Sequence, residues 1–255
     1  MHNKDFYLDV QEGNVEGYSI IHKFGGNADI LNGVWSLVSS SSPSGAFPVS
    51  GDVVRIKAGG DAADSASGVG ARSITLTGIN SDLEEITETL ITSGVNASAY
   101  SVNNFWRIYR AYVSSAGEYG GANIDNITIE NSQDMIRIRA DEGQTQHAAY
   151  AIPINKTGYL LGVHLTVDAV KAADCRMFIR KNFTDIVVPT SSKRLLLYWN
   201  GVLGQATHLP GIPCVKFDAL TDIWVEARGG GANTEVSADF EILLVDNPSG
   251  PIQQI

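Results

Sequence analysis

The stretch Arg72-Ser73-Ile74-Thr75-Leu76-Thr77-Gly78 alternates between polar and apolar side chains. Successive side chains of a β-strand point to opposite faces, so Ile74 and Leu76 share one face, while Ser73, Thr75 and Thr77 share the other. The stretch therefore predicts a strand with one buried face. The same period of two recurs at short intervals along the chain, whereas the apolar spacing typical of an amphipathic helix is hard to find.

This alternation predicts an all-β, antiparallel fold. A parallel sheet needs crossover helices, and no stretch of the sequence indicates one. Many short strands joined by turn signals are typical of a β-sandwich or a jelly roll. Strands are predicted at 52–57, 72–78, 85–92, 105–113, 123–130, 135–139, 148–154, 159–167, 176–181, 194–199, 213–217, 223–228 and 236–245.

One turn signal, Asn155-Lys156-Thr157-Gly158, separates two of these strands. It predicts a hairpin that joins 148–154 to 159–167. In the second strand the alternation places His164 and Thr166 outward. The inward side chains would be Leu161, Val163, Leu165 and Val167.

A polar break at 140–145 divides the strands into two groups. We expect a first β-domain at 51–140 and a second β-sandwich domain at 141–246. Residues 1–50 contain Gly25-Gly26 and a serine-rich run at 39–45, which predict an extended N-terminal arm or loop-rich extension. Residues 247–255 are predicted to form a C-terminal tail. Ordinary frayed termini are the alternative for both ends.

Composition excludes several classes of protein. The net charge is -10, so the chain would repel a nucleic-acid backbone rather than bind it. No stretch approaches the roughly 20 apolar residues of a membrane-spanning helix. The N-terminus lacks the basic start and apolar run of a signal peptide. We therefore expect neither nucleic acid nor a membrane span among its partners.

Motifs that carry chemistry are missing from the sequence. The five histidines are scattered, without the spacing that builds a zinc site. Asp61 and Asp64 in a glycine-bounded loop could serve a glycosidase, bind calcium, or simply form a solvated turn. The sequence predicts no catalytic residue, no cofactor and no metal site. Cys175 and Cys214 are expected to be thiols rather than a disulfide.

The densest aromatic cluster spans residues 105–112. Alternation would put Phe105, Arg107, Tyr109 and Ala111 on one face of a strand. The other face would carry Trp106, Ile108, Arg110 and Tyr112. Because both faces are bulky, the strand is either covered on both sides or buried at a subunit interface; a carbohydrate-stacking platform is the third alternative. The candidate interface residues are Phe105, Trp106, Arg107, Tyr109, Arg110 and Tyr112.

Several of these stretches resemble one known group of proteins. The segments are 58–64, 70–79 and 85–90, the strand 105–113 with Trp106 inserted in its pattern, the stretch 144–160, and Lys216-Phe217 with 221–223. Together they are similar to virion structural proteins of marine tailed bacteriophages, over most of residues 52–245. The shared motifs are turns and strands without catalytic residues.

The resemblance implies a non-enzymatic virion protein, as capsid decoration or cement, head-fibre or tail component, in a virion assembled in the host cytoplasm. It implies contacts with other virion proteins such as the major capsid protein, and favours a trimer. Self-association is also expected because no lysine between Asp61 and Phe105 protects edge strands. The alternatives are a carbohydrate- or receptor-binding β-sandwich for a host surface glycan and, third, a glycan-degrading enzyme.

Overall fold

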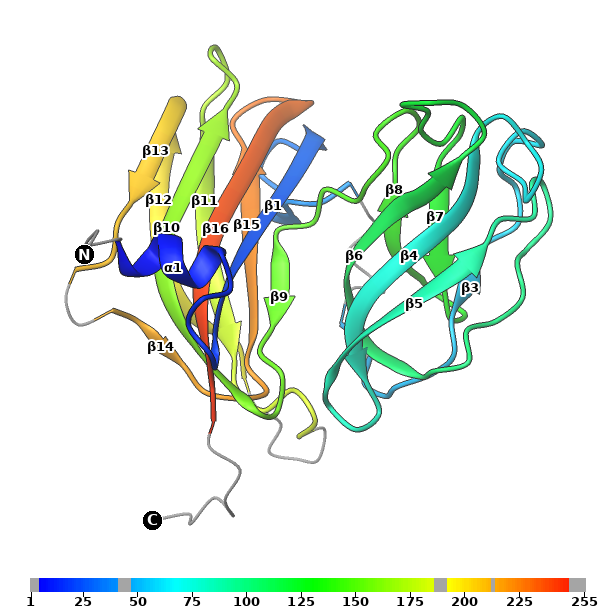
Figure 1. The fold of residues 1–255 in the computed structure, drawn as a ribbon. Helices are drawn as coiled ribbons and strands as arrows, with labels where there is room; N and C mark the ends of the chain where they lie inside the picture. The colour runs from blue at the N-terminus through cyan, green and yellow to red at the C-terminus, as the bar shows by residue number, and fades with distance from the viewer. Residues whose placement is uncertain (1–4, 41–46, 186–191, 212–213, 248–255) are drawn as a thin grey trace.

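The computed structural model describes residues 5–40, 47–185, 192–211 and 214–247. Apart from one short helix, α1 (Phe6–Gln11), its regular structure consists of strands (Figure 1). Every ladder between named strands in the described ranges is antiparallel. The all-β antiparallel prediction is confirmed. No helix in these ranges is long and apolar enough to cross a membrane.

Two sheets form what we call the larger strand group. The first has the order β1 (Tyr18–Ile30), β16 (Thr234–Asp246), β10 (Lys156–Val167) and β13 (Gly204–His208), with β14 (Lys216–Phe217) also paired to β10. The second has the order β12 (Arg194–Val202), β11 (Ala173–Arg180), β15 (Asp222–Gly229) and β2 (Ser36–Leu37), with β9 (Ala149–Ala151) also paired to β15. Side chains from both sheets, such as Leu165, Val225 and Phe240, form one buried hydrophobic cluster.

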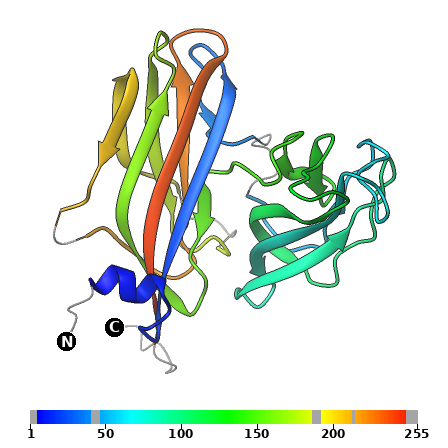
Figure 2. The same cartoon turned by 45° about the horizontal axis from the view of Figure 1, so that its top comes forward.

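The smaller strand group lies beside the larger one (Figures 1 and 2). One of its sheets has the order β5 (Glu85–Ile91), β4 (Ala71–Asn80) and β6 (Phe105–Ala116); the other has the order β3 (Arg55–Ile56), β7 (Ile127–Glu130) and β8 (Asp134–Ile138). Ile74, Leu76 and Ile136 belong to its own buried cluster. The chain enters this group after β2 and leaves it before β9, so the smaller group is inserted within the larger one.

The N-terminal segment differs from the predicted arm or loop-rich extension. Its residues 18–30 form β1, whose ladder with β16 runs from Tyr18 to Ile30 with one irregularity. The Gly25-Gly26 pair, one of the two features behind that prediction, lies inside this strand. A Cβ atom on Gly25 would lie 2.2 Å from both the Ala148 nitrogen and the Val38 oxygen. Glycine is therefore required there by a close backbone approach, not by a turn. Residues 1–4 and 41–46 of this segment, and 248–255 of the predicted tail, lie outside the described residues.

Gly25→Ala is expected to lower the free energy of unfolding by about 2 kcal/mol, because the new methyl group meets backbone atoms that cannot rotate away. Urea titration measures the change. Gly162→Ala is the matched control in the same sheet, since its Cβ would meet only ordinary contacts, at 3.5 Å from Leu209. Equal losses of stability in the two variants would contradict this explanation.

The predicted hairpin around residues 155–158 is wrong. β9 pairs with β15 and β10 pairs with β16, so the connection crosses from one sheet of the larger group to the other. The turn signal indicates a reversal of the chain but does not specify which strand is the partner. The predicted inward face also needs one correction: the ladder shifts between Leu160 and Gly162, so Leu160 is fully buried while Leu161 is only half-buried.

Candidate functional site at the seam between the strand groups

The contact between the two strand groups, which we call the seam, is centred on β6. Its pairing with β4 shifts at four places, and at two of these shifts Trp106 and Tyr109 are left as extra residues without a partner on β4. As a result Phe105, Ile108 and Ala111 enter the buried cluster of the smaller group. Trp106 and Tyr109 pack instead against the cluster of the larger group. The predicted simple alternation over 105–112 is therefore wrong, because bulges re-aim side chains.

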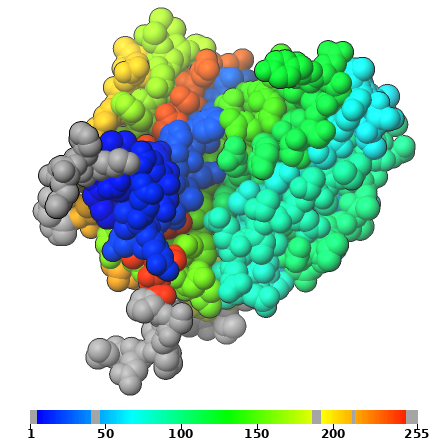
Figure 3. Space-filling model, viewed as in Figure 1, coloured from blue at the N-terminus to red at the C-terminus, as the bar shows by residue number. Residues whose placement is uncertain are grey.

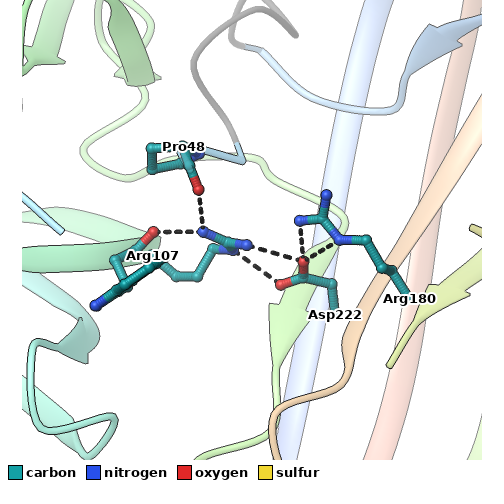
Figure 4. A network of polar contacts seen from close by, with 5 residues as sticks. Pro48, Arg107, Arg180 and Asp222 are labelled. Carbon is teal, nitrogen blue, oxygen red and sulfur yellow. Dashed lines mark hydrogen bonds and ion pairs between the residues drawn. The ribbon is translucent and has the colours of Figure 1, made fainter. Parts of the chain in front are cut away.

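Arg107 links β6 to the larger group through a buried ion network (Figure 4). Its guanidinium donates to both carboxylate oxygens of Asp222, at 2.9 and 3.0 Å. Arg180 on β11 donates to the same carboxylate, at 2.6 and 3.1 Å. Arg107 also donates to the carbonyl oxygens of Pro48 and Trp106, at 2.8 and 2.7 Å. The side chains of Arg107 and Asp222 are 3% and 0% exposed, so this pair is shielded from solvent, whereas Arg180 is 28% exposed.

Aromatic rings enclose this network. Arg107 lies over the ring of Phe183 at 4.5 Å and over that of Phe47 at 5.7 Å. Phe183 in turn packs against Trp106, with ring centroids 6.1 Å apart. A guanidinium is a favourable neighbour for a ring face, particularly away from water. The arrangement fixes how the two strand groups sit against each other.

A second polar cluster lies at the seam beside β1. The Lys23 ammonium donates to the carbonyl oxygen of Tyr109 and sits 5.6 Å from the centre of its ring. Glu85 accepts hydrogen bonds from the hydroxyl groups of Tyr109 and Tyr150, the latter at 3.2 Å. These groups line a cleft of about 500 Å³, which we call the seam cleft. Its lining also includes Thr77, Arg110 and Gln144.

Burial changes the protonation of these groups. It lowers the pKa of Lys23 from 10.5 to about 7, and the positive charge of Arg110 acts in the same direction. Burial also raises the pKa values of Tyr109 and Tyr150 well above 10, reinforced by Glu85. The phenols therefore remain neutral donors over the ordinary pH range, while Lys23 is poised to gain or lose a proton near neutrality.

His147 lies just beyond this cluster. Its Nδ1 atom is 2.9 Å from the hydroxyl oxygen of Ser39, and both residues are buried. Burial lowers the pKa of His147 to about 3, and the charge of Lys23 adds to the effect. The serine–histidine pair is 1% and 2% exposed, so a substrate has no access to it.

The predicted interface residues differ in how far they are buried. Phe105, Arg107 and Tyr109 are buried within the chain, and Trp106 is half-buried against Phe183. Arg110 is exposed and Tyr112 half-buried, and the guanidinium lies 4.8 Å from the tyrosine ring. The first part of the strand is thus covered on both sides, one of the three arrangements considered. A role in contacts between subunits stays a prediction.

The acidic loop around Asp61 and Asp64 serves the backbone. Asp64 is buried, and its carboxylate accepts hydrogen bonds from the amides of Ala71, Ile124 and Asp125 at 2.7 to 3.0 Å. Asp61 accepts from the amide of Ala63. Asp64 is therefore neither part of a solvated turn nor free to act in a catalytic pair. Its oxygens join its own loop to residue 71 and to residues 124–125. In the part of the chain that the structure describes, no three His, Cys, Asp or Glu side chains are grouped to hold a metal ion.

Cys175 and Cys214 are free thiols. Burial raises the pKa of Cys175 to about 12, and only the thiolate reacts readily. We expect an aromatic disulfide reagent to modify one thiol per folded chain quickly, and two after unfolding, as counted by absorbance. Cys175→Ala should leave the fast reaction unchanged. Rapid modification of both thiols in the folded protein would contradict the burial of Cys175.

No protein-family model matches the chain, and no curated protein matches it. Among solved structures, a T=1 particle derived from infectious bursal virus is similar at 10% identity and a TM-score of 0.26, over 91% of this chain and 70% of that one. The Gt strain of infectious bursal disease virus gives 10% identity and a TM-score of 0.27, over 97% and 80%. Scores this low do not establish a common fold.

Proposed function

We propose that the chain is a non-enzymatic structural protein of a tailed-phage virion, as capsid decoration or cement, head-fibre or tail component. The observation that carries the proposal is that the buried charged side chains of the seam, Arg107 and Asp222, form an ion pair with each other. Arg107 and Asp222, both buried, join the two strand groups, and Arg180, 28% exposed, binds the same carboxylate. A buried connection of this kind between two strand groups suits a structural part of a virus particle. The virion context comes from the resemblance of residues 58–90, 105–113 and 144–160.

The same proposal includes a finer description of the fold. We assign the larger strand group to a β-sandwich of the jelly-roll type and treat the two groups as two β-domains. Residues 51–140 would form the first. The second would contain 141–246 together with β1 and β2, because those strands pair with β16 and β15.

Self-association would use the edge formed by β12 and β13. These are terminal strands in the strand orders of the two sheets of the larger group. Large apolar side chains are exposed along and beside them, at Leu195, Tyr198, Leu203 and Leu209. An uncovered edge with apolar side chains favours pairing with another copy. The trimer rests on the phage resemblance.

Two measurements test the proposal. Light scattering of the purified protein at micromolar concentration should give a closed oligomer. Antibody labelling of virions from the source should decorate intact particles at regular positions, and particles lacking the protein should show no label. A monomer in solution that also touches no copy of itself in the particle would overturn the self-association. Absence from purified virions would overturn the virion role itself.

A glycan-degrading enzyme is less well supported. It needs two carboxylates free to act on one sugar bond, and the carboxylate of Asp64 is already occupied by backbone amides. An assay for released sugar from a panel of polysaccharides should show no turnover. Cleavage that disappears in a variant with both Asp61 and Asp64 changed to alanine would refute the non-enzymatic assignment.

A further inference from the structure

The seam cleft has the size and position of a small-molecule site. Its volume of about 500 Å³ lies within the range usual for ligand pockets. It opens where β1 of the larger group meets β4, β5 and β6 of the smaller group, a kind of junction at which ligand sites are common. In Figure 3 these segments of the two groups meet on the face that is shown.

Two cationic side chains, Lys23 and Arg110, line this cleft. Lys23 is 7% exposed, and its ammonium donates to the carbonyl of Tyr109. Arg110 donates weakly to Gln144, at 3.3 Å. Within the described ranges neither cation forms an ion pair. Lys23 and Arg110 face one carboxylate, Glu85, in the lining of the cleft. In a chain of net charge -10 this excess offers a local attraction for an anion.

The remaining lining restricts the kind of anion. Glu85 stands on the wall of the cleft, and its carboxylate already accepts from two phenols. A ligand group with two negative charges would be repelled by Glu85 more than a single carboxylate would be. Thr77 and Gln144 supply hydroxyl and amide groups, which match the hydroxyl groups of a sugar.

We propose that the seam cleft binds a sugar carrying a single carboxylate, of the uronic-acid type. The carboxylate lies between Lys23 and Arg110, and the sugar hydroxyls reach Glu85, Gln144 and Thr77. This binding activity goes beyond the structural role in a virion and does not depend on it. The charged and titratable groups around Lys23 are its strand neighbour His22, Glu85 on β5, Tyr109 and Arg110 on β6, Tyr150 on β9, and His147, which precedes β9.

Isothermal titration with glucuronate tests the proposal, with glucose and inorganic phosphate as the comparison ligands. Only glucuronate should bind. Because the carboxylate needs the protonated amine and the pKa of Lys23 is about 7, affinity should fall roughly 30-fold between about pH 6 and about pH 8.5. Equal binding of glucose or of phosphate would overturn the assignment, as would no binding of glucuronate at millimolar concentration.

Variants separate this site from general charge effects. Arg110→Gln changes an exposed residue and should weaken glucuronate binding at least tenfold. Lys23→Met should abolish the dependence of affinity on pH. Lys216→Gln removes one exposed charge outside the cleft and should leave binding unchanged. If Lys216→Gln weakens binding as much as Arg110→Gln does, the attraction is not local to the cleft and the proposal fails.

Discussion

Asp222→Ala is expected to lower the free energy of unfolding by about 3–5 kcal/mol, because it leaves a buried guanidinium without its counter-charge. Arg107 is 3% exposed and makes two of its hydrogen bonds to Asp222. Arg180, on the larger group, loses the same partner but is 28% exposed and can turn toward water. Urea unfolding followed by tryptophan fluorescence measures the loss.

Asp218→Ala provides the matched control. Asp218 also accepts from a lysine, Lys181, at 2.7 Å, but both side chains are about half exposed. Exposed ion pairs contribute about 0–1 kcal/mol, so this variant should be nearly as stable as the wild type. A loss below about 1 kcal/mol for Asp222→Ala, comparable with the control, would show that the network does not fix the seam.

A double variant identifies the origin of the loss. Arg107→Met in the Asp222→Ala background removes the stranded charge and keeps an apolar chain beside Phe183 and Phe47. Part of the lost stability should return, since apolar replacement of a buried ion pair is often nearly neutral. If the double variant is less stable than Asp222→Ala alone, the contacts of Arg107 with Pro48 and the two rings matter more than its charge.

Local alternation in the sequence was sufficient to predict much of the fold. β4 and β16 lie close to their predicted ranges, because the period of two is set by neighbouring residues alone. Positions where two backbones approach each other were not predictable in this way. The glycine pair 25–26 indicated a loop-rich extension, and only the packed fold shows that Ala148 and Val38 exclude a side chain at Gly25. The bulge beside Leu160 likewise depends on the partner strand.

The seam could be predicted only in part, for a similar reason. The aromatic content of 105–112 indicated that this strand is covered on both faces, and it singled out Arg107. Its partner Asp222 lies 115 positions further along the chain, and nothing in the sequence around Asp222 indicates a buried carboxylate. The pairing of Lys23 with Tyr109, 86 positions apart, has no local signal either. Charge partners across a tertiary contact are set by topology rather than by pattern.

The stability of the protein is expected to rise with pH between about 7 and about 10, by on the order of 3 kcal/mol. The folded state lowers the pKa of Lys23 from 10.5 to about 7. Between these values the unfolded chain binds the proton and the folded chain does not. To fold below about pH 10 the chain must bury the ammonium charge of Lys23 or release its proton, and both cost free energy. Raising the pH makes release of the proton easier, so folding becomes more favourable.

A second rise is expected at acidic pH. His147 has a pKa of about 3 in the folded state, against 6.5 as its ordinary value, so its contribution to stability is fully present above about pH 6.5 and is lost as the pH falls toward 3.

Above about pH 10 the rise of stability with pH should reverse, because burial raises the pKa values of Tyr109 and Tyr150 and the unfolded phenols ionise first.

Urea unfolding at a series of pH values, for the wild type and for Lys23→Met, isolates the lysine. The variant has no amine to titrate, so its stability should be nearly flat where that of the wild type rises, and below about pH 7 it should be the more stable of the two, because it avoids burying a charge. Lys216→Met, which removes an exposed lysine with a side chain 55% accessible, should keep the wild-type slope. A wild-type slope that persists in Lys23→Met would assign the effect to another group. It would also remove the basis for treating the buried amine as the group that gives the seam cleft its dependence on pH.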